Sequence, residues 1–257
     1  EQRDDNDDVV FSGPITLRLF DSVAPLATQR LVDLVNSGYY TNKIFHRALD
    51  NFVIQGGSPN GDGQGGAPGF ADFEDELDPD YTFASPGVLA MANAGDDNNN
   101  AQFFITDVDL GLAGRPQSLN FNHTILGVLT AGFDVDTQII TTPKTFNGFE
   151  QSRPVNDVVI RSATVFTDSD NGVLRIDAPV GYSGSGTVTV TPSDDTGASA
   201  PLVLNTAATP VSTNSRAFLG PLGDLTTRQG TPVAFPVTGT DVDGDQLFFK
   251  VVSGDDP

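Results

Sequence analysis

Residues that could do chemistry lie between positions 45 and 123 of this chain of 257 residues. Phe45-His46-Arg47 is followed closely by Phe52-Val53-Ile54-Gln55-Gly56-Gly57, so a cation stands near an apolar run and an amide side chain. The chain has no Cys, which excludes a thiol nucleophile and thiolate metal sites. His123 has no paired carboxylate pattern around it, so we reject an acid–base triad. The remaining possibility is catalysis by binding and electrostatic polarisation of a substrate.

These residue types suit catalysis of rotation about a peptide bond. The rotation faces a barrier of about 18–20 kcal/mol because amide resonance is lost, and X-Pro bonds are the ones that populate the cis form substantially. A catalyst of this step needs no nucleophile and no metal. It needs an apolar pocket for the proline ring, a cation or donor that favours the twisted amide, and polar groups that hold the neighbouring backbone.

Five motifs in order resemble those of the cyclophilin family of peptidyl-prolyl cis-trans isomerases. Besides the two segments above, they are Phe73-Glu74-Asp75-Glu76, Met91-Ala92-Asn93-Ala94-Gly95 and Gln102-Phe103-Phe104-Ile105. Each alone would be weak evidence, since an aromatic residue in an apolar run is usually a core residue. Their joint spacing is specific, and the resemblance runs from about Val9 to Asp168. It implies a peptidyl-prolyl isomerase that needs no cofactor and acts on proline-containing polypeptides.

The resemblance implies a role for each matched residue. Arg47 matches the catalytic arginine, whose guanidinium can engage the prolyl carbonyl and the amide nitrogen. His46 beside it is then structural. The walls of the proline pocket and its edge match Phe52, Val53, Phe104, Leu119 and His123. The groups that hold the substrate main chain and line the neighbouring shallow groove match Gln55, Gln102, Asn93 (through its backbone), Ala92 and Gly63.

Two departures from the family pattern lie between Thr106 and Asn122. This stretch is longer than the family's usual loop, so the comparison is re-anchored by Leu119 and by His123–Gly127. Ser118 stands where many eukaryotic members carry a tryptophan. We therefore expect weakened binding of cyclosporin-like inhibitors, which use that indole, with isomerisation retained; nanomolar inhibition would refute this expectation.

Short strands are the main elements expected to position these residues. Apolar runs separated by Gly, Asn and Asp clusters predict a mainly β fold, a closed antiparallel barrel. The resemblance implies that this barrel is cyclophilin-like, with two short helices. The runs are Lys43–Phe45, Phe52–Gln55, Gly87–Met91, Phe103–Ile105 and Thr124–Leu129. Val9–Phe11 and Ile15–Phe20 flank Ser12-Gly13-Pro14 and predict a hairpin, and Val155–Phe166 is expected to be a closing strand. The glycine-rich run Gly61–Gly66 is interpreted as a surface loop rather than a phosphate cradle, because no Lys or helix start follows it.

The two helices are predicted near each end of the barrel segment. Pro25 opens a stretch in which Leu26, Leu31, Leu34 and Val35 recur at near-helical spacing, and Gly38 follows its end. Pro at the first turn and Gly after the last one are typical helix boundaries. Phe133–Ile140 is the second predicted helix.

The bulk composition excludes several classes of partner. The chain has 13 basic and 34 acidic residues, a formal charge of -21, which repels nucleic acid and anionic membranes. Solubility, or adaptation to a salty or calcium-containing exterior, explains this acidity better than a specific basic partner. No run approaches the ~18 apolar residues of a membrane helix. The isomerase domain is expected to be monomeric.

The composition of the chain changes near Thr167. We predict that the chain consists of four segments. Residues 1–8 are a flexible lead-in, 9–168 the isomerase domain, 169–216 a β-rich segment and linker, and 217–257 the incomplete start of another domain. With Gly230-Thr231-Pro232-Val233 before Asp241-Val242-Asp243-Gly244-Asp245, the last segment resembles a cadherin-like or immunoglobulin-like β-sandwich repeat of bacterial surface proteins. Calcium ligation by Asp241, Asp243 and Asp245 and a solvated acidic turn are the two interpretations; an EF-hand is rejected because Gly is misplaced and no Glu follows at the twelfth position.

Two hypotheses follow for the whole chain. In the first, it is a fragment of a longer modular protein, exported to the periplasm, cell surface or outside, whose isomerase assists the folding of exported proteins. In the second, the same fold is a non-catalytic module that binds proline-containing segments on an adhesive surface protein.

Overall fold

The computed structural model describes residues 1–110 and 119–168, together with 174, 176, 183–191, 193–194, 197–198, 200–208, 218–219 and 239–240. Contacts divide the chain into two units, Glu1–Val173 and Leu174–Pro257, which are described separately. Within the described ranges, no helix combines the length and the apolar character needed to cross a bilayer.

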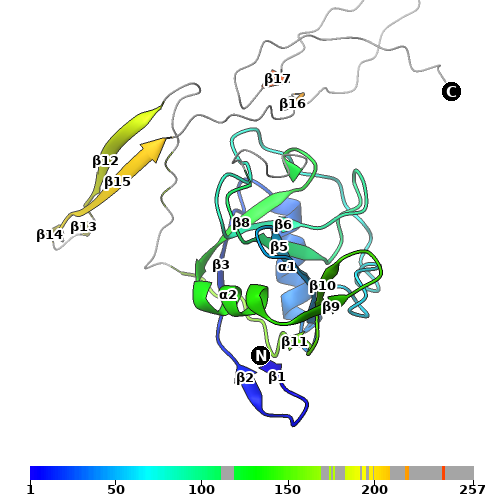
Figure 1. The fold of residues 1–257 in the computed structure, drawn as a ribbon. Coiled ribbons are helices and arrows are strands. Elements are labelled where there is room, and N and C mark those ends of the chain that lie inside the picture. The colour runs from blue at the N-terminus through cyan, green and yellow to red at the C-terminus, as the bar shows by residue number, and fades with distance from the viewer. Residues whose placement is uncertain are drawn as a thin grey trace, which may run out of the picture. The chain divides into compact units, whose positions relative to one another are not determined.

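The first unit is built on one curled antiparallel sheet of nine strands (Figure 1), in the order β2-β1-β11-β4-β5-β7-β6-β8-β3. In chain order these strands are β1 Gln2–Arg3, β2 Val9–Phe11, β3 Thr16–Leu19, β4 Ile44–Ala48, β5 Val53–Gly56, β6 Val88–Met91, β7 Phe103–Thr106, β8 Ile125–Ala131 and β11 Val158–Val159. A separate hairpin pairs β9 Lys144–Phe146 with β10 Gln151–Pro154. The predicted mainly β fold with two helices is confirmed.

Helix α1, Pro25–Asn36, takes its first cap from a distant residue. Ala24 precedes the helix and offers no side-chain hydrogen bond. The carboxylate of Glu76 instead accepts bonds from the backbone amides of Leu26, at 2.9 Å, and Ala27, at 2.8 Å. A carboxylate at this end satisfies free N–H groups and complements the helix dipole. The second helix, α2, spans Phe133–Thr141, close to its predicted range.

The central strands bury side chains on both faces. Leu89 and Met91 of β6 belong to a cluster that also holds the buried residues of both helices, which we call the helix-side cluster. The alternate residues Val88 and Ala90 belong to a second cluster, drawn from strands and loops, which we call the loop-side cluster: Val53, Phe83, Val88, Ala90, Phe104, Leu110 and Ile125. Because successive side chains of a strand point to opposite faces, burial of both faces explains the nearly continuous apolar runs of the sequence.

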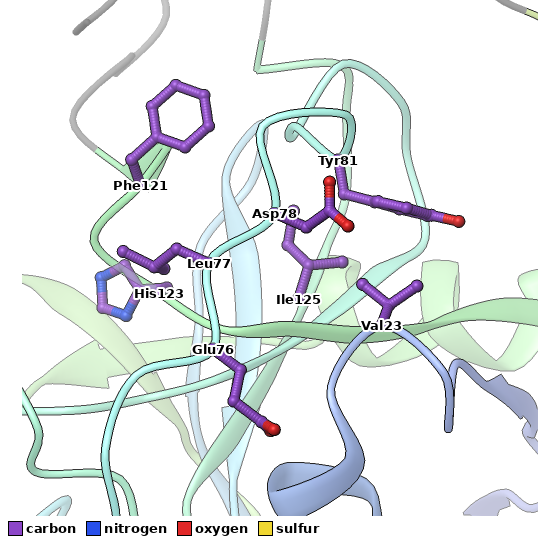
Figure 2. A pocket seen from close by; sticks show the side chains of 8 residues that line it. All are labelled: Val23, Glu76, Leu77, Asp78, Tyr81, Phe121, His123 and Ile125. Atoms are coloured by element: carbon purple, nitrogen blue, oxygen red, sulfur yellow. The ribbon is translucent and has the colours of Figure 1, made fainter. Parts of the chain in front are cut away.

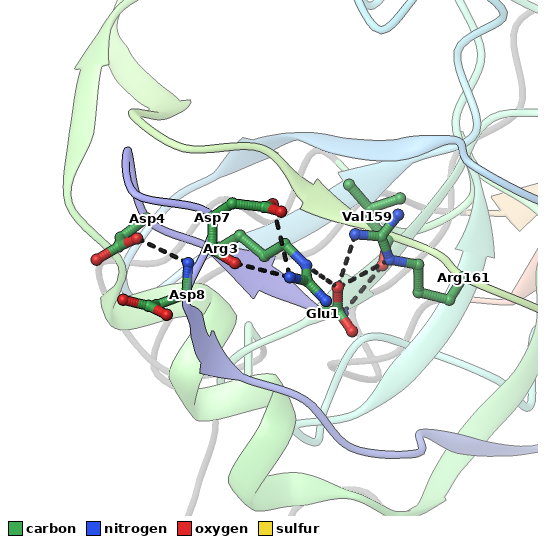
Figure 3. Close-up of polar contacts among 7 residues, drawn as sticks. All are labelled: Glu1, Arg3, Asp4, Asp7, Asp8, Val159 and Arg161. Atoms are coloured by element: carbon green, nitrogen blue, oxygen red, sulfur yellow. Dashed lines mark hydrogen bonds and ion pairs between the residues drawn. The ribbon is translucent and has the colours of Figure 1, made fainter.

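Residues 1–8 do not form a lead-in outside the domain, which corrects the prediction. Gln2 pairs with Val158 of β11 and with Phe11 of β2. The Glu1 carboxylate accepts bonds from Arg3 Nε at 2.7 Å and Arg161 Nη2 at 2.6 Å (Figure 3). The acidic residues that suggested a mobile segment occupy the turn between β1 and β2, where charge is compatible with order because it faces solvent.

The predicted N-terminal hairpin and closing strand are also corrected. Val9–Phe11 pairs with β1, while Thr16–Leu19 pairs with β8. The stretch around Gly13-Pro14 therefore connects the two edge strands of the sheet and does not pair them. Of Val155–Phe166, two residues, Val158 and Val159, form strand β11.

The second unit contains paired strands in its described residues. Strand β12, Gly184–Val190, pairs over its whole length with β15, Leu202–Ala208. Both strands lie within residues 169–216, for which the sequence predicts a β-rich segment and linker. Shorter pairs join β13 Ser193–Asp194 to β14 Gly197–Ala198 and β16 Phe218–Leu219 to β17 Gly239–Thr240. Asp241, Asp243 and Asp245 lie outside the described residues.

Candidate active site

Strand register places the predicted catalytic side chains in one row across the sheet. Arg47 of β4 is paired with Gln55 of β5, and Gln55 with Phe104 of β7. Phe104 is paired in turn with Ala90 of β6, and Ala90 with Ile125 of β8. Residues directly opposite each other share a face, so a cation, an amide and an aromatic ring stand side by side on the loop-side face.

The predicted wall of the proline pocket is assembled on this face. The ring of Phe104 stacks on Phe83, with centroids 5.5 Å apart, and meets His123 edge-on at 5.3 Å. The other predicted wall and groove residues that pack in or against the loop-side cluster are Phe52, Val53, Ala92 and Leu119. Phe83 was missed by sequence reasoning, because it lies in an irregular stretch with no strand period.

The guanidinium of Arg47 lies over the ring of Phe52, with 5.3 Å between its central carbon and the ring centroid. A cation in this position is attracted by the electron-rich face of the ring. Glu150 accepts bonds from Arg47 Nε at 2.5 Å and Nη2 at 3.3 Å. Arg47 Nη1 lies 3.5 Å from Gln55 Oε1, a long contact. Glu150 was not among the predicted site residues.

The two predicted glutamines have fixed orientations. The amide nitrogen of Gln102 donates to the carbonyl oxygens of Gly63, at 3.1 Å, and Gly65, at 2.9 Å. Carbonyl oxygens accept and do not donate, so the oxygen of the Gln102 amide must face Gln55, whose nitrogen donates to it at 3.2 Å. The oxygen of Gln55 is then left facing Arg47. This relay sets the polar edge beside the aromatic wall.

The glycine-rich loop turns its carbonyls, not its amides, toward the site. Gly63 has φ +79°, and a Cβ there would lie 3.3 Å from His46 Nε2. Its N–H donates to Ser58 Oγ at 3.1 Å. A phosphate cradle requires free amides directed at the ligand, which agrees with the interpretation of this run as a surface loop.

Both histidines are neutral at pH 7, for the same reason. Burial, reinforced by the charges of Arg153 and Arg47, lowers the pKa of His46 to about 4. Burial also lowers the pKa of His123. The Nδ1 atom of His123 lies 3.1 Å from the Met91 carbonyl and therefore carries the proton. His123 thus meets the aromatic wall edge-on, with Nδ1 committed to a backbone carbonyl.

The remaining predicted residue, Asn93, uses its side chain structurally. Its Nδ2 donates to Asp75 Oδ1 at 3.2 Å and to the Asn122 carbonyl at 3.0 Å. The neighbouring Ala92 amide donates to the carbonyl of Gln102 at 2.9 Å. The side chain of Asn93 therefore holds two loops together beside the groove.

A small pocket adjoins the wall through His123 and Ile125 (Figure 2). It is lined by Val23, Glu76, Leu77, Asp78, Tyr81, Phe121, His123 and Ile125. The Glu76 carboxylate is engaged by helix α1, and Asp78 accepts a bond from the Asp80 amide at 2.8 Å. Apart from these engaged carboxylates, its lining is largely apolar. Over the part of the chain that the structure describes, no cluster of three or more His, Cys, Asp or Glu side chains is arranged to hold a metal ion.

Comparison with known proteins decides the family. The profile described as "Cyclophilin type peptidyl-prolyl cis-trans isomerase/CLD" matches residues 7–165. The chain belongs to the cyclophilin family. Peptidyl-prolyl cis-trans isomerase-like 1 of Mus musculus is 40% identical over 59% of this chain and 86% of its own length. The protein of the same name from Gibberella zeae is 38% identical over 62% and 92%.

The fold comparison agrees. A crystal structure of a cyclophilin-type peptidyl-prolyl cis-trans isomerase of Cryptosporidium parvum, determined in the presence of the dipeptide Ala-Pro, is 33% identical. It superposes with a TM-score of 0.54 and covers 60% of this chain and 93% of its own. The cyclophilin domain is therefore a peptidyl-prolyl cis-trans isomerase that binds proline-containing peptides. The roles of its individual residues stay predictions.

Proposed function

We propose that the cyclophilin domain rotates exposed X-Pro bonds during the folding of exported proteins. The observation that carries the catalytic part is the row of Arg47, Gln55 and Phe104 on one face of the sheet. It sets a guanidinium and an amide directly beside an aromatic wall. Such an arrangement can bind a proline ring and at the same time polarise the X-Pro peptide bond that precedes it.

In the proposed mechanism the proline ring lies against Phe104, Phe52 and His123. The Arg47 guanidinium donates to the prolyl carbonyl and faces the amide nitrogen as that atom becomes pyramidal. The nitrogen lone pair is localised only in the twisted amide, so this interaction is stronger in the transition state than in either planar isomer. No proton is transferred, which suits a neutral His123 that donates Nδ1–H to a backbone carbonyl.

The polar groups beside the wall complete the mechanism. Gln55 and Gln102 are held by each other and by the loop carbonyls, so they need no reorganisation when a substrate main chain docks beside them. When the backbone on one side of the X-Pro bond is held still, the segment on the other side is the one that rotates. Binding energy then favours the twisted state.

The exported setting draws its support from the sequence. The formal charge of -21 and the resemblance of residues 217–257 to a cadherin-like repeat favour a modular protein outside the cytosol. Fractionation of the native cells tests this: recovery with exported proteins supports it, and recovery with cytosolic proteins overturns it. Melting of the intact chain with and without calcium tests the proposed ligands Asp241, Asp243 and Asp245 separately.

A protease-coupled assay on an X-Pro peptide tests the activity. The wild-type chain is compared with Arg47→Ala and with Arg47→Lys, which keeps the charge but loses the planar fork. We expect wild-type acceleration, near-complete loss in Arg47→Ala and a large loss in Arg47→Lys. If the wild type matches the uncatalysed rate, the chain is the proline-binding module of the alternative hypothesis.

A further inference from the structure

Glu150 is a charged residue that the structure adds beside the predicted catalytic arginine. Its two carboxylate oxygens accept from Nε and Nη2 of Arg47, at 2.5 and 3.3 Å. Both side chains are about two-thirds buried, with exposed fractions of 32% for Glu150 and 27% for Arg47. Paired charge-assisted bonds of this kind fix direction as well as distance.

We propose that Glu150 is a positioning residue of the isomerase. It fixes the plane of the Arg47 guanidinium so that the edge formed by Nη1 and Nη2 stays open to the substrate carbonyl. This inference rests on the isomerase activity of the domain and concerns how its arginine is held.

The turn that carries Glu150 is shaped independently of Arg47. Asn147 Oδ1 accepts the backbone amides of Phe149 and Glu150, both at 3.0 Å. The Asn147 amide donates to the Glu150 carbonyl at 3.0 Å, and its Nδ2 donates to the buried Ser152 hydroxyl at 3.0 Å. An Asn that bonds its own backbone two or three residues on is a standard means of closing a turn. The backbone of Glu150 is thus in place before the ion pair forms.

The hairpin is also anchored to the sheet on either side of the ion pair. Lys144 Nζ of β9 lies 2.5 Å from Asp50 Oδ1, in the turn between β4 and β5. Arg153 Nη1 of β10 donates to the Gly61 carbonyl at 2.5 Å. Strand β10 packs beside β4, which carries Arg47. Glu150 therefore stands at a defined place relative to Arg47.

The geometry of the guanidinium shows which donors stay available. Its five N–H groups lie in one plane. Glu150 engages the edge formed by Nε and Nη2, and Gln55 Oε1 lies 3.5 Å from Nη1. The edge between Nη1 and Nη2 is therefore the one free of a carboxylate. Rotating the guanidinium plane would break two charge-assisted hydrogen bonds. The arginine is therefore preorganised, and its side chain needs no reorientation when the transition state forms.

The Arg47 hydrogen bonds lower the pKa of Glu150 below its ordinary value, against the opposing effect of burial. The carboxylate is consequently ionised at neutral pH. In Glu150→Gln, the amide would keep one acceptor for Arg47 Nε but direct a donor at Nη2. This predicts a loss of activity smaller than that of Glu150→Ala.

The test compares Glu150→Ala and Glu150→Gln with the wild-type chain by exchange NMR on an X-Pro peptide at several peptide concentrations. We expect kcat to fall about tenfold in Glu150→Ala and about threefold in Glu150→Gln, with KM within twofold. Asp33→Asn, which removes an equal charge from the exposed face of helix α1, is expected to keep wild-type kinetics.

A second readout separates positioning from a purely structural role. The Nε–H resonance of Arg47, assigned by its absence in Arg47→Lys, is expected to move upfield and broaden in Glu150→Gln while backbone signals outside residues 144–154 keep their positions. An unchanged resonance, or a Glu150→Ala rate equal to or above wild type, would overturn the proposal. Wild-type activity at the uncatalysed level would overturn instead the activity on which it rests.

Discussion

The two faces of the nine-stranded sheet are built from alternate residues of the same strands and do different work. The helix-side cluster is closed over by α1 and α2 and is apolar. The loop-side cluster is covered in part by half-buried residues such as Phe52, Ala92 and Leu119, and its border carries Arg47 and Gln55. Stability is therefore expected to depend mainly on the helix-side face and catalysis on the loop-side face. Even adjacent residues are divided in this way, since Leu89 lies on the first face and Ala90 on the second.

Leu89→Ala provides the largest expected effect. Leu89 is fully buried on the helix-side face, and removing such a side chain costs its burial and leaves a cavity, about 3 kcal/mol in the free energy of unfolding. Urea denaturation measures this, and kcat/KM per folded molecule is expected to stay within twofold. Leu26→Ala, at a site 44% exposed on α1, is the control and is expected to change stability by less than ~0.5 kcal/mol. A tenfold fall in the activity of folded Leu89→Ala would contradict the division between the faces.

Asp136→Asn sharpens the comparison within the helix-side face. Burial, with a smaller contribution from Asp107, raises the pKa of Asp136 to about 7, and its Oδ1 has no hydrogen-bond partner in the described part of the chain. A raised folded-state pKa gives stability that is present below the unfolded value near 4 and is lost as pH rises toward 7 and above.

The variant is therefore expected to be more stable than wild type at pH 8 by more than ~1.4 kcal/mol, the equivalent of one pKa unit. The two proteins should be nearly equal at pH 4. Denaturation curves at both pH values give the difference directly. A gap that does not change with pH would show that Asp136 does not titrate as its surroundings imply.

Phe52→Ala tests the loop-side face with a smaller effect. The ring supports the Arg47 guanidinium from 5.3 Å and forms part of the proline wall, so we expect kcat/KM to fall about tenfold, or ~1.4 kcal/mol. Because Phe52 is half-buried, its loss should cost less stability than Leu89→Ala. Phe166→Ala, at a position 65% exposed, is the matched control. Equal losses of activity in the two variants would rule out a specific role for Phe52.

Much of the fold and site could be predicted because local patterns carry them. Proline and glycine mark the ends of α1, and burial on both faces of the sheet produces the apolar runs of β5 to β8. The family motifs also coincide with strand positions, so the spacing of Arg47, Gln55 and Phe104 along the chain translates into one row across the sheet.

Several of the misses depend on long-range pairing, which local patterns do not encode. The predicted hairpin was wrong because Thr16–Leu19 pairs with the distant strand β8, while Val9–Phe11 pairs with β1. Residues 4–8 form the turn between β1 and β2, although their acidic composition resembles that of a free terminus. Glu150 lies 103 residues beyond Arg47, and its approach depends on how the β9–β10 hairpin docks. No periodicity or motif at Glu150 signals that contact.

Exchange NMR of an X-Pro peptide with catalytic amounts of wild type and Arg47→Ala tests the central claim most directly. Uncatalysed isomerisation takes tens of seconds or longer. The loop-side face predicts cis–trans exchange cross-peaks within about a second for the wild type. For Arg47→Ala it predicts a loss of at least about a hundredfold, ~2.7 kcal/mol, while the peptide still shifts the resonances of the wall residues. Equal exchange in both proteins would contradict a catalytic Arg47, and binding without exchange in the wild type would contradict the isomerase itself.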